Sequence, residues 1–364
     1  MRARILYLVG HLRSGGLERQ LYYLLRTMDR DLFAPAVVVW NFDERDVYVR
    51  RFRELGVPVY ELDGGKSVVA RLRALRVLAQ TTHAEVVHSY TFYMNVAAEW
   101  AAIGSRRLAV GSLRSDFDWA RRESGALLSC LSGSRPRDQI CNSYSAARAI
   151  SRSRSPFVPR RIHTVRNGVD LELFTYSPLR EAAEPHIVGV GNLLPVKRWH
   201  LLLAAASELT RLRVPYRMTI VGDGPLRDAL ERKVVSLGVA RSVRLAGYCD
   251  DVASLIAEAT VLVHAAEAEG CPNAVMEAMA CGRPVVAMNA GDIPRIVRDG
   301  ETGFVVENGD SVALVNRVRR LIQTPGLARQ MGDAGRRLAE KEFSLDRLVS
   351  GTLSVYERAG WKAA

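Results

Sequence analysis

Two glutamates, Glu269 and Glu277, lie eight positions apart in the stretch EAEGCPNAVMEAMACGRPVV. Pro272 and Asn273 between them are typical of a helix start, so we expect Glu269 in a loop after a strand and Glu277 about one turn into the helix. Amides at the start of a helix can bind a diphosphate, and a carboxylate can accept two hydrogen bonds from a ribose diol. The pair predicts a nucleotide site at the carboxyl edge of a parallel sheet.

Each glutamate also has a purely structural explanation. Glu277 would complement the helix dipole, and Glu269 would be a surface acid of the loop. Neither explanation accounts for two acids that flank a Gly-x-Pro turn, Gly270 to Pro272.

Glycine pairs follow predicted strands in two further places. Gly15 and Gly16 come between the first strand and a helix that starts near Leu17, where backbone amides can approach a phosphate. The Gly-x-Gly-x-x-Gly pattern of dinucleotide-binding proteins is not met there, and an ordinary tight turn is the alternative. Gly222 and Gly224 repeat the arrangement, and we expect that turn to be mainly structural.

Short aliphatic runs alternate with longer amphipathic stretches along the whole chain, which indicates parallel sheets covered by helices, an α/β fold. In the first half the predicted strands cover residues 4–10, 34–40, 57–62, 85–89, 108–113, 139–143 and 162–165. In the second half they cover residues 186–193, 217–222, 243–248, 260–265, 284–288 and 302–307. Two Rossmann-like units follow from this alternation.

The chain length of 364 residues favours two domains, because single cores stop growing near about 250 to 300 residues. We expect an N-terminal domain over 1–175, a C-terminal domain over 176–343, and a final helix over 344–364. The stretch 175–186, which contains two prolines and lacks apolar periodicity, is the predicted linker.

Composition and cysteine usage are those of an ordinary globular protein. Hydrophobic residues make up 48% and charged residues 25%. The five cysteines form no Cys-x-x-Cys pair and are odd in number, so the sequence indicates neither a zinc site nor a disulfide framework. The first apolar run is too short for a signal peptide, and no run is long enough to span a membrane. These features favour a reducing, cytoplasmic compartment.

The net charge of +12 is concentrated in the first half of the chain. Residues 1–175 hold 27 Arg and Lys against 17 Asp and Glu, and the range 105–166 holds 13 arginines against four acids. Such a surface favours an anionic partner, of which an anionic membrane is one. The alternative is a solvated face in a chain that prefers arginine, since it has 46 Arg and five Lys.

The stretch from Glu269 to Val286 closely resembles the Glu-x7-Glu signature of retaining glycosyltransferases of family four. Other stretches resemble the same family in the same order along the chain: Gly15-Gly16-x-Glu18-Arg19, VVHSYTFYMN, CNS, NGVD, VGNLLPVK, VGDGP and DGETGFVV. The resemblance extends over about residues 4 to 358.

The resemblance implies a GT-B architecture, in which two Rossmann-like domains flank a cleft and the last helix returns to the N-terminal domain. Glu277 would hold the ribose, and Glu269 would contact the donor sugar near the reacting carbon. Lys197 would neutralise the diphosphate, which gains charge as the glycosidic bond breaks. The remaining donor-binding positions that it implies are Gly15, Gly16, Asn192, Gly222, Gly247, Tyr248, Gly270, Cys271, Pro272, Asn273 and Ala274.

This chain departs from the family pattern in three places. Asn192 replaces the arginine that usually accompanies Lys197, and Arg198 is the expected substitute. Tyr90 takes the place of a histidine near the donor sugar, and a tyrosine is a poor base at neutral pH. Asp292 and Arg295 stand where a glycine and a glutamate are commoner, which we expect to change only surface contacts.

Three residues of the N-terminal half, His11, His88 and Arg114, are expected on the acceptor side. His88 at a strand end is equally consistent with a hydrogen-bonded core histidine. Arg114 would grip a phosphate or a carboxylate of the acceptor, with a solvated loop as the alternative. Asp116 and Asp118 nearby lack metal-ligand spacing, so no bound metal is expected.

These features together predict a retaining transferase that moves a sugar from UDP or GDP to a hydroxyl acceptor, with no cofactor required. The acceptor would be a glycan, a lipid-linked precursor or a small metabolite. Peripheral contact with the inner face of an anionic membrane is expected through the basic half, and specific nucleic-acid binding is not. The alternatives are an epimerase of the same fold, which forms product from donor alone, and a catalytically reduced protein that binds anionic surfaces.

Overall fold

The computed structural model describes residues 2–65, 67–114 and 125–362. By its internal contacts the chain divides into two compact units. The first unit comprises Met1–Gly168 and Leu345–Ala364, and the second unit comprises Val169–Ser344. Every predicted strand is found, within two residues at most ends, and each unit has one fully parallel sheet.

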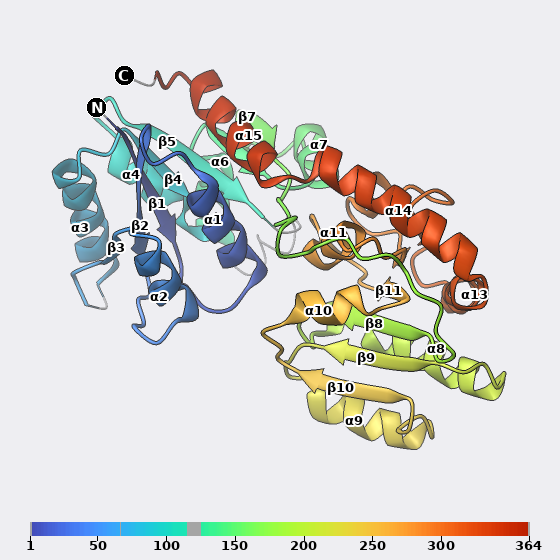
Figure 1. Cartoon of the computed structure of the whole chain (residues 1–364). Coiled ribbons are helices and arrows are strands. Elements are labelled where there is room, and N and C mark those ends of the chain that lie inside the picture. Colours follow the sequence, from blue (N-terminus) through green and yellow to red (C-terminus); the bar gives the residue numbers. More distant parts are fainter. Residues whose placement is uncertain (1, 66, 115–124, 363–364) are drawn as a thin grey trace. The chain divides into compact units, whose positions relative to one another are not determined.

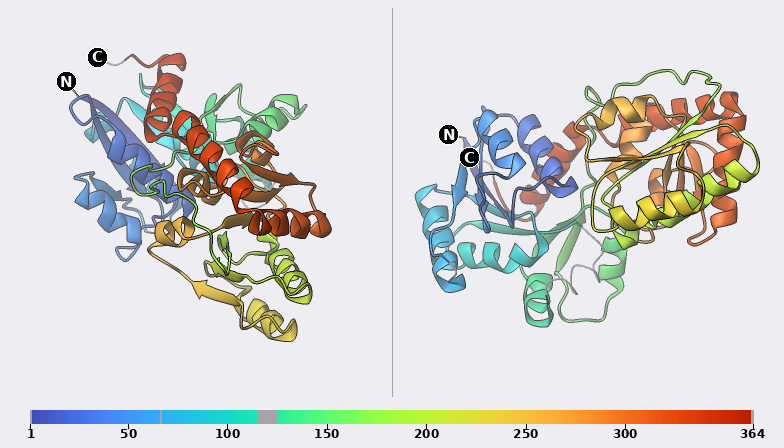
Figure 2. Two further views of the ribbon diagram at one scale, coloured as in Figure 1. Left: turned by 45° about the vertical axis from the view of Figure 1, so that its right-hand side comes forward. Right: turned by 90° about the horizontal axis from the view of Figure 1, so that it is seen from below.

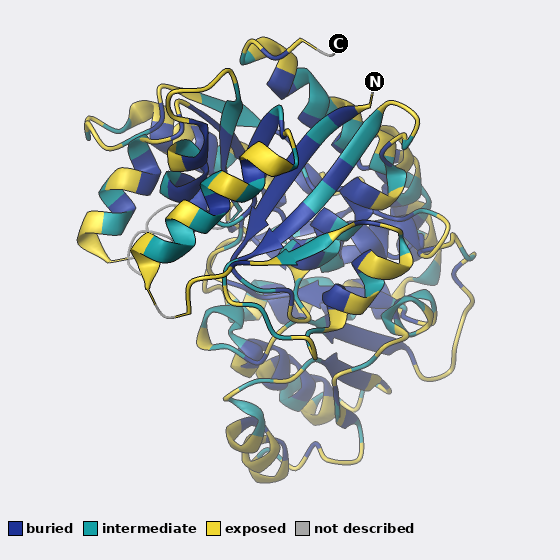
Figure 3. Ribbon diagram, turned by 90° about the vertical axis from the view of Figure 1, so that its left-hand side faces the viewer, coloured by how far each residue is buried: buried dark blue, intermediate teal, exposed yellow. Residues whose placement is uncertain are grey.

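The sheet of the first unit has the order β3-β2-β1-β4-β5-β6-β7 (Figure 1). Its strands are β1 (Ala3–Val9), β2 (Phe33–Val39), β3 (Val59–Glu61), β4 (Val86–Ser89), β5 (Leu108–Leu113), β6 (Asp138–Cys141) and β7 (Arg161–Thr164). The central strands are buried along their length, as expected for a parallel sheet that helices cover on both faces (Figure 3).

Helices cover the two faces of this sheet in separate groups. Helices α1, α2 and α15 pack on one face, and α3 and α4 pack on the other. The helices are α1 (Gly16–Thr27), α2 (Val47–Glu54), α3 (Val68–Thr81), α4 (Asn95–Ala102), α6 (Ala126–Ser134), α7 (Tyr144–Arg152) and α15 (Leu345–Arg358), with a 3-10 turn η1 (Phe92–Met94). The side chains of Ser67 and Ser143 cap α3 and α7.

The sheet of the second unit has the order β10-β9-β8-β11-β12-β13. Its strands are β8 (His186–Val190), β9 (Arg217–Val221), β10 (Val243–Gly247), β11 (Val261–His264), β12 (Val285–Met288) and β13 (Gly303–Val306). Strand β11 reads VLVH and β12 reads VVAM, and every residue of both is buried.

The helices of the second unit again form two layers, which can be followed in Figure 2. Helices α8, α9 and α13 pack on one face, and α10, α11 and α12 pack on the other, where α14 contacts α11. Their bounds are α8 (Trp199–Arg211), α9 (Arg227–Ser236), α10 (Val252–Ala257), α11 (Asn273–Ala280), α12 (Ile293–Ile296), α13 (Ser311–Gln323) and α14 (Pro325–Glu342), with a 3-10 turn η2 (Pro195–Lys197).

The first boundary between the units lies between Gly168 and Val169, earlier in the chain than the predicted boundary at residue 175. The reason is packing, because Val169 and Phe174 belong to a core cluster of the second unit. The Val169 amide also donates to the carbonyl of Phe343 at 2.7 Å. The last helix, α15, packs in the core of the first unit beside α1, as the family resemblance implied.

Both sheets have a point where the strand order reverses. In the first unit β1 pairs with both β2 and β4, and in the second unit β8 pairs with both β9 and β11. Loops that leave the carboxyl ends of the two central strands diverge at such a point and open a crevice, the usual ligand site of this class of sheet.

Candidate functional site

Two predicted residues of the second unit, Lys197 and Glu269, meet a residue that was not predicted, His264, beyond the carboxyl ends of β8 and β11. Lys197 lies in η2 after β8, His264 ends β11, and Glu269 lies in the loop that follows. The Lys197 ammonium donates to Glu269 Oε1, and His264 Nε2 lies 3.1 Å from the same oxygen. All three side chains are largely buried. The switch point of this sheet therefore holds a compact cluster of charge.

The environment keeps Glu269 ionised. Burial on its own raises the pKa of this carboxyl, but contact with His264 and the charge of Lys197 outweigh burial and lower the pKa to about 2. A carboxylate held in this way accepts hydrogen bonds and does not act as a proton donor near neutral pH.

The loop of Glu269 is held against a glycine. Gly291 has a φ of 54°, and a Cβ at this position would overlap the backbone carbonyl of Glu269. Asp292, the next residue, is fully buried. The expectation that Asp292 changes only surface contacts is therefore wrong, because this loop packs directly behind the loop of Glu269.

Helix α11 begins beside this cluster. Pro272 is its N-cap and makes no side-chain cap hydrogen bond, and no acid lies in the first turn of the helix. Backbone amides at a helix start are groups that an anionic ligand can satisfy. Glu277 lies on the same helix with 2% of its surface exposed. The positions Gly270, Cys271, Asn273 and Ala274 surround this helix start, as the sequence predicts.

Two further predicted residues, Asn192 and Arg198, follow β8. Arg198 adopts a left-handed backbone, with φ at 49°, and its guanidinium bonds to Glu267 and to Asn308 Oδ1 at 2.7 Å. Arg198 is therefore paired in this structure, as Lys197 is, and its role as a substitute for the missing family arginine stays a prediction. Asn192 is exposed, and its backbone carbonyl accepts a hydrogen bond from the Trp199 indole N–H at 3.0 Å.

The predicted glycines of this edge have clear packing roles. A Cβ at Gly222 would overlap the carbonyl of Gly191, and the Gly222 amide donates to Gly247 O at 2.8 Å. These contacts join the loops that follow β8, β9 and β10. Tyr248, next to Gly247, is 59% exposed at the same edge.

In the first unit the glycine turn between β1 and α1 lies against Glu18, an acidic residue of α1. Glu18, in the first turn of α1, is buried, and a Cβ at Gly15 would overlap its carboxylate. His11 Nδ1 lies 3.1 Å from Glu18 Oε1, and this contact raises the pKa of His11. The amino terminus of α1, with Gly16 as its first residue, is thus already complemented by a carboxylate.

Tyr90 and Arg114 form a stacked pair after β4 and β5. The Arg114 guanidinium lies 3.7 Å from the centroid of the Tyr90 ring. Tyr90 is fully buried, and burial raises the pKa of its hydroxyl against the opposing charge of Arg114. All three guanidinium nitrogens of Arg114 are buried without a hydrogen bond of good geometry to the described residues. The Tyr90 hydroxyl is likewise buried without a hydrogen bond of good geometry to the described residues, so both groups of this pair are incomplete there.

His88 is a core histidine in this structure. Its Nδ1 lies 2.7 Å from the Tyr356 hydroxyl and its Nε2 lies 2.9 Å from Ser112 Oγ. Tyr356 in turn donates to the Tyr7 hydroxyl at 3.2 Å. Burial, followed by the charge of Arg114, lowers the pKa of His88 well below its usual value. Both ring nitrogens are engaged, which favours the structural alternative for this residue.

The described residues include no group of His, Cys, Asp and Glu side chains that could hold a metal ion. In the described part of the chain no helix has the length and apolar character to cross a bilayer. The predicted loop acids Asp116 and Asp118 lie outside the described residues.

Each half of the chain matches a family model of glycosyltransferases. Residues 14–173 match the model described as "Glycosyltransferase Family 4", and residues 184–324 match "Glycosyl transferases group 1". The chain belongs to the family-four glycosyltransferases. Its first matched region lies in the first unit almost entirely, and its second matched region lies in the unit that holds Lys197, Glu269 and Glu277.

Curated relatives of this glycosyltransferase chain act on different substrates. N-acetyl-alpha-D-glucosaminyl L-malate synthase of Bacillus anthracis is 27% identical over 203 residues, 54% of this chain and 53% of the relative. D-inositol 3-phosphate glycosyltransferase of Streptomyces bingchenggensis is 30% identical over 222 residues, 55% of this chain and 48% of the relative. The chain thus spans about half the length of the curated relatives it matches.

A solved structure shows the same fold over nearly the whole glycosyltransferase chain. HepE of Anabaena, in complex with UDP, has a TM-score of 0.82 and 21% identity, with 98% of this chain and 100% of HepE covered. The predicted GT-B fold is therefore confirmed.

Sequence reasoning missed His264 and the inward position of Glu18. His264 ends a buried aliphatic strand, TVLVHA, and a polar residue at the carboxyl end of a central strand is a signal that was present in the sequence. Glu18 carried no such signal, because its position over Gly15 depends on the local turn.

Proposed function

We propose that this protein transfers a sugar, with retention of configuration, from a nucleoside diphosphate sugar to a hydroxyl acceptor. The observation that carries the proposal is the cluster of Lys197, His264 and Glu269 beside the amino terminus of α11. Cation, ionised carboxylate and helix amides at a sheet switch point are the groups that a sugar diphosphate requires. Membership of family four gives this cluster its reaction class.

In this mechanism the first turn of α11 and Lys197 bind the diphosphate and stabilise the charge that it gains as it departs. Glu277 holds the ribose hydroxyls, and ionised Glu269 accepts hydrogen bonds from the donor sugar. The departing diphosphate takes the acceptor proton on the same face of the sugar, so no metal or other cofactor is required. Because Lys197 pairs with Glu269 in this structure, the diphosphate would compete with Glu269 for that lysine.

UDP is the donor nucleotide that we propose. HepE, which shares the fold, was solved in complexes with UDP and with UDP-glucose. The exposed Tyr248 beside Gly247 supplies a ring for the base in this assignment.

The roles of the two glutamates are tested by replacing Glu277 with Ala and Glu269 with Gln. Loss of charge-assisted hydrogen bonds, worth about 1.5–3 kcal/mol, is expected to weaken UDP binding by Glu277→Ala about 10- to 100-fold in calorimetry. Glu269→Gln is expected to lower the rate of UDP release from UDP-sugar with smaller loss of UDP affinity. Glu301→Gln, an exposed acid of the second unit, is the control. Wild-type affinity and rate in both variants would refute the site assignment.

We propose further that the acceptor carries a phosphate or carboxylate beside its reacting hydroxyl. Among the described residues the buried Arg114 guanidinium has no hydrogen bond of good geometry, which is costly, and an acceptor anion would supply one. The names of two relatives specify acidic acceptors, L-malate and D-inositol 3-phosphate.

The acceptor class is tested with matched pairs, D-inositol 3-phosphate against inositol and L-malate against its dimethyl ester. Arg114→Gln is expected to raise the KM for the charged acceptor more than tenfold while the KM for UDP-sugar stays unchanged, and Arg114→Lys is expected to restore part of the loss. Arg106→Gln, an exposed arginine of the same unit, is the control. Equal use of charged and neutral acceptors would contradict this assignment.

Cytoplasmic location and peripheral contact of the first unit with an anionic membrane complete the proposal. The five free cysteines and the basic residues of the first half support these two points. Binding to anionic vesicles that weakens steeply with added salt is the expected behaviour.

A further inference from the structure

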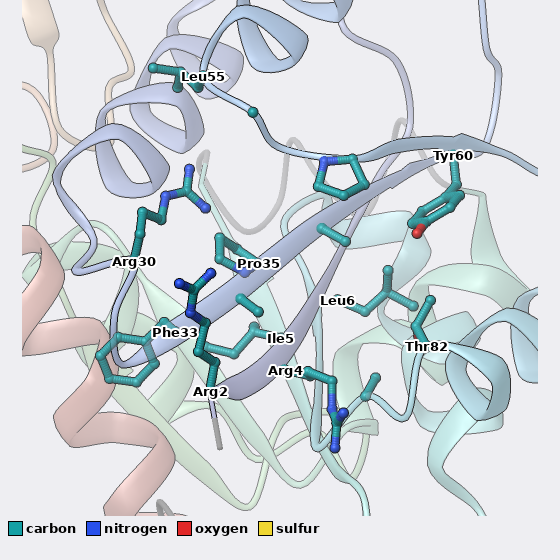
Figure 4. Close-up of a pocket in the computed structure, with 15 residues that line it drawn as sticks. Arg2, Arg4, Ile5, Leu6, Arg30, Phe33, Pro35, Leu55, Tyr60 and Thr82 are labelled. Carbon is teal, nitrogen blue, oxygen red and sulfur yellow. The ribbon is translucent and has the colours of Figure 1, made fainter.

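The amino ends of β1 and β2 in the first unit border a cavity of about 420 Å³ (Figure 4). Three arginines line it, Arg2, Arg4 and Arg30, together with apolar side chains that include Phe33 and Pro35. No acidic residue belongs to the lining. The cavity is therefore a basic hollow with a largely apolar wall, here called the arginine pocket.

The arginines of this pocket are poorly paired within the described part of the chain, although the Glu85 carboxylate accepts a hydrogen bond from the Arg4 backbone amide at 3.1 Å. The side chains of Arg4 and Arg30 form no ion pair or hydrogen bond there, and Arg4 Nε is buried without a partner. Arg2 reaches Asp31 only at 3.8 Å, and both of these side chains are well exposed. Partial burial also lowers the pKa of Arg30.

The arginine pocket is separate from the residues assigned to sugar transfer. Its members Arg2 and Arg4 lie at the start of β1, whereas His11 follows the other end of the same strand. A seven-residue strand is about 20 Å long, so a ligand in the pocket does not reach the carboxyl edge of the sheet.

We propose that the arginine pocket binds a phosphate ester. Guanidinium groups match phosphate oxygens through paired N–H donors, and a phosphate would supply the ion-pair partner that the side chains of Arg4 and Arg30 lack among the described residues. The organic part of the ester lies against Phe33 and Pro35, in a volume within the usual range of small-molecule sites. A soluble phosphorylated metabolite and a phospholipid headgroup share this chemistry.

The pocket is tested with an Arg4→Gln/Arg30→Gln double variant of the full chain. Glycerol 3-phosphate binding is measured by calorimetry, and vesicle binding is measured by sedimentation with phosphatidylglycerol against phosphatidylcholine. An Arg232→Gln/Arg241→Gln double variant removes the same charge from exposed positions of the second unit and is the matched control. Wild type and control are expected to bind a phosphate ligand at least tenfold more tightly than the pocket variant.

A soluble phosphate ester and a phospholipid headgroup predict different binding results for the pocket variant. Binding of glycerol 3-phosphate that the pocket variant loses supports a soluble ligand, and a loss confined to phosphatidylglycerol vesicles supports a lipid headgroup. Equal binding by the pocket variant and the control, or no binding of either ligand by wild type, overturns the proposal. Melting temperature checks that the variant is folded, and UDP affinity, expected to be unchanged, separates this site from the proposed transfer site.

Discussion

Glu269 shows how neighbours decide what one side chain can do. Its carboxyl is largely buried, which on its own favours the neutral acid, yet His264 and Lys197 hold it ionised. Without Lys197, which follows β8, and His264, which ends β11, the same residue would be an ordinary loop acid.

The depressed pKa of Glu269 predicts a definite pH dependence of stability. A carboxyl with a folded pKa of about 2 and an ordinary unfolded value near 4.5 stabilises the fold above pH about 4.5, and this contribution is lost as the pH falls toward 2. Between pH 6 and pH 4 wild type is expected to lose about 1 kcal/mol relative to Glu269→Gln. Urea unfolding at the two pH values measures this difference. The exposed-acid variant Glu301→Gln should follow wild type, and a constant gap between wild type and Glu269→Gln would contradict the prediction.

At the scale of elements, α15 is tied to the first unit by a buried polar contact as well as by apolar packing. Leu348 and Val355 lie in the core beside α1 and β1, and Tyr356 bonds to His88 in the same layer. The polar contact specifies the position of the helix, because a shift would leave buried polar atoms of two strands unpaired.

Replacing Tyr356 with Phe is expected to lower the free energy of unfolding by about 1–3 kcal/mol, since it leaves His88 Nδ1 buried without a partner. Glu357→Gln, on the exposed side of the same helix, should change stability by less than about 0.5 kcal/mol. Chemical denaturation of the two variants measures both. A Tyr356→Phe protein as stable as wild type would show that the bond to His88 contributes nothing net.

For the whole molecule, the important fact is that each unit has its own sheet and core. The cluster of Lys197, Glu269 and Glu277 lies entirely within the second unit. Because a ligand at this cluster binds only the native form of the second unit, it raises the free energy of unfolding of that unit.

UDP at about 100 times its Kd is therefore expected to raise a melting transition by about 5–10 °C, from about 2.7 kcal/mol of added stability. Calorimetric scans with UDP, GDP and ADP compare the three bases directly. Glu277→Ala should abolish most of the rise. Equal shifts with all three nucleotides would argue against UDP as the specific donor, and no shift with any would argue against the proposed donor site.

Much of this molecule followed from local pattern in the sequence. Aliphatic runs such as VLVH in β11 and VVAM in β12 predicted buried parallel strands, because periodicity and composition are local properties of the chain. Pro272 placed the start of α11 correctly for the same reason. The family motifs are also local, which is why the sequence by itself predicts a donor site at Glu269 and Glu277.

Tertiary structure alone decided which of these residues meet. Lys197 and Glu269 are 72 positions apart, and only the adjacency of β8 and β11 joins them and recruits His264. The same holds for Arg198, which pairs with distant Asn308, and for the arginine pocket, whose members come from the starts of different strands. Spacing along a chain specifies turns and helices, whereas strand order specifies the partners of a charge, and partners determine its chemistry.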